Sequence, residues 1–280
     1  MKYSILILLL WQFAFLWQPI QATETIKVAC VGNSITYGTG ITNRDTDSYP
    51  AQLQKLLGKK YSVGNFGKPG ATLLAHGHRP YIQQEEYQKA LDFSGDIVVI
   101  HLGINDTDPR NWPNYRDEFV HDYLRLIDSF KKVNPQCRIL LAYITPIADR
   151  HPRFISGTQQ WHEEIQEAIK VVAQISQAEL IDFHTPLYPY PILLPDAIHP
   201  NEEGAHILAQ TAYSAITGDY GGLKLPMLYT DYMVLQRNTP LRIHGTANTK
   251  TPVTVSIDGQ KKKTIADTNG KWEVILDPIK

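Results

Sequence analysis

Four short segments of the sequence combine glycine with polar side chains that are able to do chemistry. Each follows, directly or after a loop, an apolar stretch that is typical of a β-strand. Because ligands of open α/β sheets bind beyond the carboxyl ends of the strands, we expect the four segments to meet at one edge of a sheet. The segments are Gly32-Asn33-Ser34-Ile35-Thr36, Asn65-Phe66-Gly67-Lys68-Pro69-Gly70-Ala71-Thr72, Gly103-Ile104-Asn105-Asp106 and Asp196-Ala197-Ile198-His199-Pro200.

A serine, a histidine and a carboxylate are the residue types that nucleophilic catalysis requires. The Ser34 hydroxyl is a weak nucleophile until a base removes its proton, and we predict that His199 is this base. Asp196 would hold the imidazole in the required tautomer and stabilise the imidazolium. Negative charge that develops on the substrate then needs hydrogen-bond donors. We predict three, the backbone N–H groups of Ser34 and Gly70 and the side-chain amide of Asn105, each stabilising the transition state by about 3–4 kcal/mol.

Each residue also has an interpretation without catalysis. Ser34 is a suitable N-cap for a helix that follows the first strand. Asn105 is typical of a left-handed turn, and Asn105-Asp106-Thr107 is an N-glycosylation sequon. His199 precedes Pro200, as is common for a histidine in a surface loop. Taken singly these interpretations are the more common ones, but the four segments in this order favour catalysis.

The elements that must position these residues alternate between strand and helix as far as about residue 217. This alternation predicts parallel βαβ units and a three-layer α/β domain over residues 23–219. Apolar runs predict strands at residues 26–31, 61–65, 96–102, 138–143 and 180–183. Apolar residues at helical spacing predict helices at residues 49–57, 117–133, 158–176 and 202–216.

In this order and on these elements, the four segments resemble the sequence blocks of the SGNH hydrolases, a division of the GDSL esterase/lipase family. Ser34 matches the family's nucleophile, Gly70 the glycine of the second block and Asn105 the asparagine of the third. Asp196 and His199 match the Asp-x-x-His pattern of the last block. The resemblance implies a flavodoxin-like sheet, an exposed active site and ester hydrolysis that needs no metal or other cofactor.

Two positions depart from the family pattern or match it loosely. Asn33 stands where the family name expects aspartate, although it is not one of the predicted catalytic groups. The second block is the loosest match, and Gly67 competes with Gly70 for the place of its glycine.

Residues 1–22 have the features of a signal peptide. Lys2 is followed by an apolar stretch from Ile5 to Trp17, and Ala22 offers a small-residue cleavage site. The apolar stretch is shorter than the ~20 residues that span a bilayer. We therefore expect export to the periplasm or the extracellular space, with no membrane span.

The sequence pattern changes after residue 219. Short strands are predicted at residues 241–243, 253–257 and 272–276, between turns such as Asp258-Gly259 and Asn269-Gly270. This predicts a β-sandwich-like module over residues 220–280, which we expect to be the start of a larger domain. Residues 223–237, 253–258 and 269–272 resemble the opening of the sialate O-acetylesterase family. That resemblance implies release of acetate from acetylated sugars, with O-acetylated sialic acid as the leading substrate.

Composition excludes several other classes of protein. The chain has 280 residues, of which 43% are hydrophobic and 20% charged, as in ordinary globular proteins. The net charge of −1 gives no basic excess for binding nucleic acid. Cys30 and Cys137 lie at apolar, strand-like runs, so we expect buried thiols rather than a disulfide. The basic run Lys261-Lys262-Lys263 is predicted to be a solvated strand edge.

Other binding motifs fit less well. The spacing Gly64-x-x-Gly67-x-x-Gly70 is not the dinucleotide-binding pattern, and the sequence has neither a phosphate-binding Gly-Lys-Ser/Thr loop nor a Gly-x-Ser-x-Gly elbow. His76 and His78 have a metal-like spacing without companion ligands, so we expect loop histidines. Four aromatic residues are candidates either for a sugar pocket or for packing, namely Trp112, Trp161, Tyr188 and Tyr190.

The prediction is a serine esterase that removes O-acetyl groups from a small-molecule or glycan ester. Two alternatives stay open. One is an SGNH esterase with another substrate, such as acetyl-xylan, a short-chain lipid ester or a thioester. The other is a protein without catalytic activity that binds glycans through its β module.

Overall fold

The computed structural model describes residues 24–152 and 158–279. The predicted signal peptide at residues 1–22 lies outside the described residues, so it stays a prediction. Within the described ranges, every helix is too short or too polar to cross a membrane.

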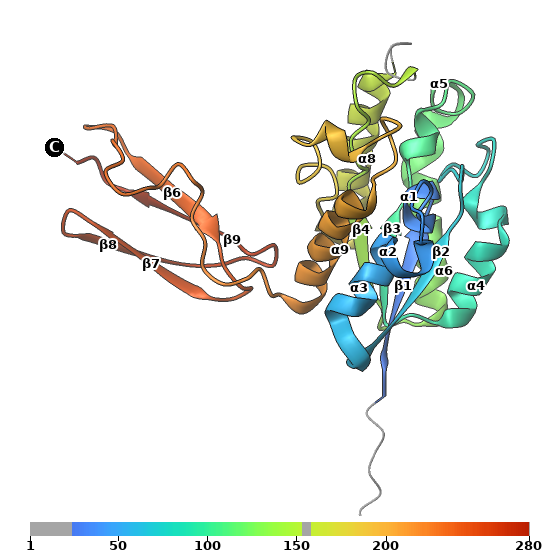
Figure 1. Ribbon diagram of the computed structural model, residues 1–280, viewed down its shortest axis with the longest axis horizontal. Coiled ribbons are helices and arrows are strands. Elements are labelled where there is room, and N and C mark those ends of the chain that lie inside the picture. Colours follow the sequence, from blue (N-terminus) through green and yellow to red (C-terminus); the bar gives the residue numbers. More distant parts are fainter. Residues whose placement is uncertain (1–23, 153–157, 280) are drawn as a thin grey trace, which may run out of the picture.

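A parallel sheet with the strand order β2-β1-β3-β4-β5 forms the centre of the molecule (Figure 1). Gly32 at the end of β1 pairs with Gly67 of β2 on one side and His101 of β3 on the other, so three strands end at the same level. The predicted α/β fold is confirmed. The strands are β1 (Ile26–Gly32), β2 (Tyr61–Gly67), β3 (Ile97–His101), β4 (Arg138–Ala142) and β5 (Glu179–Ile181).

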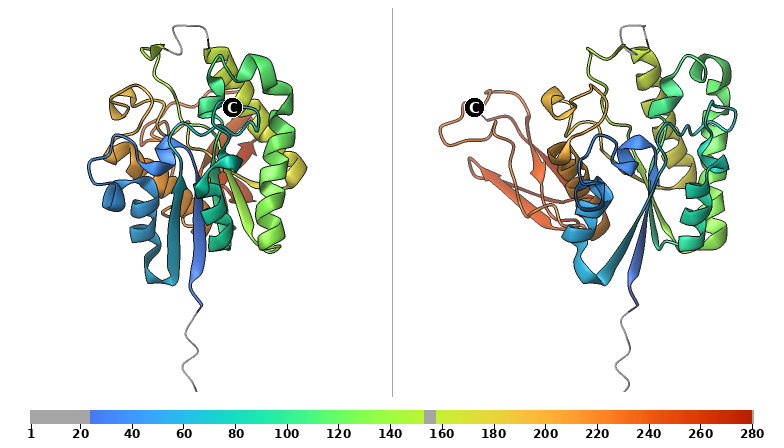
Figure 2. Two further views of the ribbon diagram at one scale, coloured as in Figure 1. Left: turned by 90° about the vertical axis from the view of Figure 1, so that its right-hand side faces the viewer. Right: turned by 45° about the vertical axis from the view of Figure 1, so that its right-hand side comes forward.

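Helices cover both faces of this sheet, which explains why all of β3 is buried and apolar apart from its final histidine (Figure 2). On one face α3 (Tyr49–Leu57) packs against α9 (Glu202–Thr217). On the other face α6 (Phe119–Val133) lies between α4 (Glu85–Phe93) and α8 (Gln159–Ser176). The α6 face toward the core carries residues at helical spacing, Phe119, Tyr123, Leu126, Ile127 and Phe130.

Some elements were not predicted from the sequence. Helix α4 is mostly polar and fully buries Ala90 alone among its residues, so its apolar periodicity is weak. Three helices of four residues each are too short to show any periodicity, α1 (Ser34–Tyr37), α2 (Arg44–Asp47) and α5 (Trp112–Tyr115).

The C-terminal residues form two antiparallel pairs, β6 (Leu241–Thr246) with β9 (Lys271–Leu276) and β7 (Pro252–Ile257) with β8 (Gln260–Ile265). They lie beside the face of the α/β domain that carries α9 (Figure 1). The lysine run at 261–263 lies on β8, a solvated strand as predicted. This module has a small apolar core of its own, made of Leu241, Ile243, Ala247, Val253, Ala266, Trp272, Val274 and Leu276.

Both cysteines are free and buried, so the prediction of buried thiols is confirmed. Burial raises the pKa of the Cys30 thiol to about 12, which keeps it in the unreactive protonated form.

His101 is a buried polar residue at the carboxyl end of β3. Its Nε2 accepts a hydrogen bond of 3.2 Å from the Thr145 backbone N–H, and its ring lies against Phe183. Its Nδ1 has no partner in the described part of the chain. Burial, with a smaller contribution from His162, lowers the pKa of His101 to about 3 from its ordinary value of 6.5, so the ring is neutral in the folded protein.

We predict that His101 makes the protein less stable in acid. Between pH 6.5 and about pH 3, His101 binds a proton in the unfolded state but stays neutral in the folded state. The free energy of unfolding therefore falls as the pH is lowered across this window, by at most about 1.4 kcal/mol per pH unit. Urea unfolding at pH 7 and pH 4.5 measures the effect. His101→Gln keeps an acceptor for Thr145 and should lose less stability between these pH values than the wild type. Equal losses in the two proteins would contradict the prediction.

Candidate active site

Asn33 positions Ser34 at the carboxyl end of β1. The fully buried Asn33 side chain accepts a hydrogen bond of 2.9 Å from the Ile35 N–H and donates one of 3.1 Å to the His101 carbonyl. Asn33 is therefore the N-cap of α1, and the interpretation of Ser34 as the cap is wrong. A carboxylate at this position has no proton to donate to His101, which gives a physical reason for asparagine in place of aspartate.

The two competing glycines of the second segment have different surroundings. A Cβ atom on Gly67 would lie 2.1 Å from the backbone nitrogen of Tyr37, so this glycine allows α1 to pack directly on the end of β2. Gly70 lies in the loop beyond, with φ of +76°, a backbone conformation that favours glycine. Gly67 is thus a packing position, whereas Gly70 belongs to the loop that faces the other site segments.

The structure brings Ser34, His199 and Asp196 together. His199 Nε2 lies 2.8 Å from Ser34 Oγ, and His199 Nδ1 lies 2.6 Å from Asp196 Oδ2. Because a carboxylate only accepts hydrogen bonds, the ring carries its proton on Nδ1 and leaves Nε2 free to accept the serine proton. His199 does lie in a loop, but its ring makes a contact on each side, with Ser34 and with Asp196.

Asp196 also shapes the loop that carries His199. Its Oδ1 accepts the backbone N–H groups of Ile198 at 3.1 Å and His199 at 2.7 Å. Partial burial alone would raise the pKa of Asp196, but these hydrogen bonds and the one from the His199 ring outweigh it and lower the pKa. The carboxylate is thus held ionised. Ala197, the residue after Asp196, has φ of +73°, and its carbonyl accepts a hydrogen bond of 2.8 Å from the Ala148 N–H.

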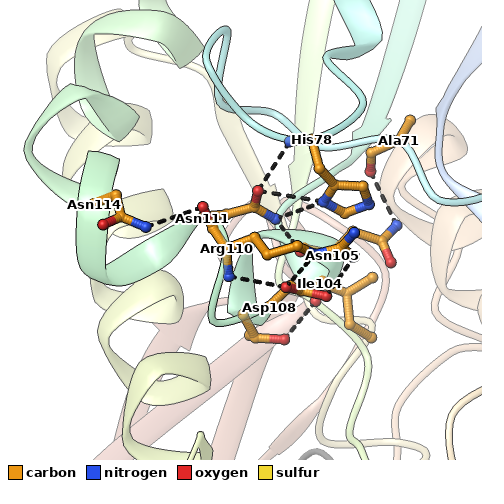
Figure 3. A network of polar contacts seen from close by, with 9 residues as sticks. Ala71, His78, Ile104, Asn105, Asp108, Arg110, Asn111 and Asn114 are labelled. Carbon is orange, nitrogen blue, oxygen red and sulfur yellow. Dashed lines mark hydrogen bonds and ion pairs between the residues drawn. The ribbon is translucent and has the colours of Figure 1, made fainter.

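The predicted oxyanion donors lie on three neighbouring segments. Asn105 is in a 3₁₀ helix after β3 and has no left-handed φ, so the turn interpretation is wrong. One of its two amide protons binds the Ala71 carbonyl at 3.0 Å, which leaves the second available (Figure 3). The backbone N–H groups of Ser34 and Gly70 have no acceptor within the described ranges.

Asp106 is a buried residue that sequence reasoning did not assign. Its two carboxylate oxygens accept the backbone N–H groups of Leu73 and Leu74, both at 2.9 Å. Burial raises the pKa of Asp106 to about 6, against the opposing effect of these hydrogen bonds. Asp106 thereby connects the loop after β2 to the segment after β3. The signal for it in the sequence was its place beside Asn105.

The remaining candidates from the sequence lie elsewhere or have other partners. His76 Nδ1 lies 2.7 Å from a Glu118 oxygen, whereas the His78 ring contacts Asn111, so the two histidines do not share a ligand position. Trp112 is buried and packs edge-on against Phe119, which assigns it to the core rather than to a sugar pocket. Two of the other aromatic residues are exposed, Tyr188 and Tyr190.

A parallel sheet with a serine, a histidine and an aspartate in hydrogen-bonded series at its carboxyl edge defines the class of α/β serine hydrolases. Within that class, the chain belongs to the GDSL-like lipase/acylhydrolase family, whose sequence model matches residues 30–207. The part of the predicted recognition that concerns this family is thereby confirmed.

One curated relative is an acetylxylan esterase from Xylanibacter ruminicola, 37% identical over 216 residues. The match covers 71% of this chain but 44% of the relative, so the chain spans less than half of that protein's length.

Solved structures share the fold. One is an acetyl xylan esterase, AlAXEase, with 21% identity and a TM-score of 0.53, covering 68% of this chain and 100% of that one. Another is a GDSL-like lipase from Bacteroides thetaiotaomicron, with 20% identity and a TM-score of 0.52. The match covers 74% of this chain and 94% of that one.

We predict that Asn33→Ala lowers both stability and activity. The change leaves the Ile35 N–H and the His101 carbonyl without their buried partner, at a cost of about 1–3 kcal/mol in the free energy of unfolding. Urea unfolding and ester hydrolysis measure the two effects. Asn43→Ala is the matched control, because Asn43 begins α2 without a side-chain cap and should change neither quantity. Equal effects of the two substitutions would refute the role of Asn33.

Proposed function

We propose that this protein is a serine esterase that removes O-acetyl groups from carbohydrates. The observation that carries the proposal is the hydrogen-bonded series from Ser34 Oγ through the His199 ring to Asp196. Family membership supports ester hydrolysis, and the acetylxylan esterase relative supports an acetylated sugar as substrate.

In the proposed mechanism, His199 Nε2 takes the Ser34 proton as Oγ attacks the acetyl carbonyl carbon. The carbonyl oxygen becomes an oxyanion, which the N–H groups of Ser34 and Gly70 and the Asn105 amide stabilise. When the tetrahedral intermediate collapses, the C–O bond to the sugar breaks and His199 gives its proton to the departing hydroxyl. Water then attacks the carbonyl carbon of the acetyl-serine as His199 takes a proton from it. The bond from the acetyl carbon to Oγ breaks, His199 returns the proton to Ser34, and acetate leaves.

Asp196 acts in this mechanism through its position and its charge. It holds Nδ1–H toward itself and stabilises the imidazolium that forms at each proton transfer. About half of the Asp196 side chain is exposed, so water screens part of its charge. Its hydrogen bonds to backbone N–H groups keep the carboxylate in place despite this exposure.

Two acetylated sugars are candidate substrates. The relative from Xylanibacter ruminicola favours acetylated xylan. The resemblance of residues 223–237, 253–258 and 269–272 to the sialate O-acetylesterase family favours O-acetylated sialic acid. Each rests on a separate observation, so a direct comparison of the two substrates decides between them.

We predict that Ser34→Ala abolishes acetate release. Without the nucleophile, kcat should fall by about 10⁴- to 10⁶-fold. The matched control is Ser129→Ala on α6, where the hydroxyl donates to the Leu126 carbonyl at 2.6 Å and plays no part in the mechanism. Activity that survives Ser34→Ala in the folded protein would exclude this mechanism. Glycan binding without acetate release by the wild type would instead support a binding protein.

A substrate comparison tests the carbohydrate assignment. We expect acetate release that depends on Ser34 from acetylated xylan, O-acetylated sialic acid or both, and the ratio of kcat/KM identifies the preferred sugar. p-Nitrophenyl acetate serves as the reference for intrinsic esterase activity. Release from this reference alone would keep the serine mechanism and refute the carbohydrate substrate.

A further inference from the structure

We propose that Asn111 is a positioning residue that holds the Asn105 amide in its oxyanion-binding place. The proposal rests on the proposed function, because it assigns Asn111 a role through one of the predicted oxyanion donors. Asn111 lies at the start of α5, outside the sequence motifs, and its side chain is fully buried.

The Asn111 side chain joins the loop after β2, at His78, to the segment after β3 that carries Asn105 (Figure 3). Its Nδ2 donates a hydrogen bond of 2.8 Å to the Asn105 carbonyl. Its Oδ1 accepts one of 2.9 Å from the backbone N–H of His78, and Nδ2 also lies 3.0 Å from the His78 ring nitrogen Nδ1. One rigid, planar amide thus spans the loop after β2 and the segment after β3.

These contacts close a frame around Asn105. The Asn105 side chain holds the loop after β2 at the Ala71 carbonyl, and Asn111 holds the same loop at His78. Asn111 also donates a hydrogen bond to the Asn105 backbone carbonyl. Because the two segments are connected on both sides of Asn105, its backbone and its side chain are fixed together, and the second amide proton keeps one direction. Burial excludes water that would compete for these hydrogen bonds.

Helix capping does not explain the Asn111 side chain. It precedes α5 but makes no side-chain hydrogen bond to that helix. Its backbone carbonyl is the group that accepts the first N–H groups of the turn, from Asn114 and Tyr115. The amide side chain points instead to Asn105 and His78 (Figure 3).

A double-mutant cycle on p-nitrophenyl acetate tests the proposal. Asn105→Ala should lower kcat by about 10²- to 10³-fold. Asn111→Ala should lower kcat by about 10- to 100-fold, because it displaces that donor, while KM changes by less than about threefold. In the Asn105→Ala background, Asn111→Ala should cost less than about twofold, since the group it positions is already gone.

Asn114→Ala is the matched control for the cycle. Asn114 is an exposed asparagine of the same segment, donates to the Arg110 carbonyl at 3.1 Å, and should leave kcat unchanged. Thermal unfolding of every variant checks that it is folded. If Asn111→Ala does not fold, Asn111→Asp keeps the acceptor for the His78 N–H, loses the donor to Asn105, and should show the same dependence on Asn105.

The outcomes separate this proposal from the proposed function. Losses that multiply independently in the cycle, or full kcat in a folded Asn111 variant, would overturn the positioning role and leave the esterase mechanism intact. Full kcat in Asn105→Ala would remove the oxyanion role of Asn105, and the role of Asn111 with it. Activity in Ser34→Ala is the separate result that would overturn the mechanism itself.

Discussion

The site depends on how closely the first turn of α1 approaches the ends of the central strands. Gly32 and Gly67 have no side chains at the two places where a Cβ atom would lie 2.1 Å from an atom of α1. Asn33 then fastens the turn to β3 through the His101 carbonyl. Ser34 is therefore held by close packing of α1 on two strands and by the hydrogen bond from Asn33 to a third strand. This fixes the position from which its hydroxyl contacts the His199 imidazole.

Around this turn, polar contacts between loops help to position the site residues. Buried amides and carboxylates join the segments after β2 and β3, and a partly exposed carboxylate shapes the loop before α9. Asp106 and Asn111 each bind backbone groups more than 30 residues away in the sequence. The buried side chains of Asp106 and Asn111 are paired, as unpaired ones would be costly. These hydrogen bonds add to the apolar packing of the same loops, where Ala71, Leu73 and Ile104 belong to the hydrophobic core.

Much of this arrangement was predictable from the sequence, because its signals are local. Alternating apolar runs and helical periodicity identify the sheet and α3, α6, α8 and α9. The four motifs identify residues that lie at one edge of the sheet, namely Ser34, Gly70, Asn105, Asp196 and His199. Helix α4 was missed because it buries so little, and Asn111 was missed because its partners are distant in the sequence and no motif marks it.

The hydrogen bond between Ser34 and His199 joins residues that are 165 positions apart. Ser34 lies in α1, directly after the first strand of the sheet to be synthesised, whereas His199 precedes the last helix of the domain. A domain generally folds as a unit, and its chain is synthesised at about 5–20 residues per second. A growing chain that already contains Ser34 therefore still lacks His199. The contact between Ser34 and His199 therefore requires almost the whole α/β domain to be in place, so this one hydrogen bond is a marker of the completed fold.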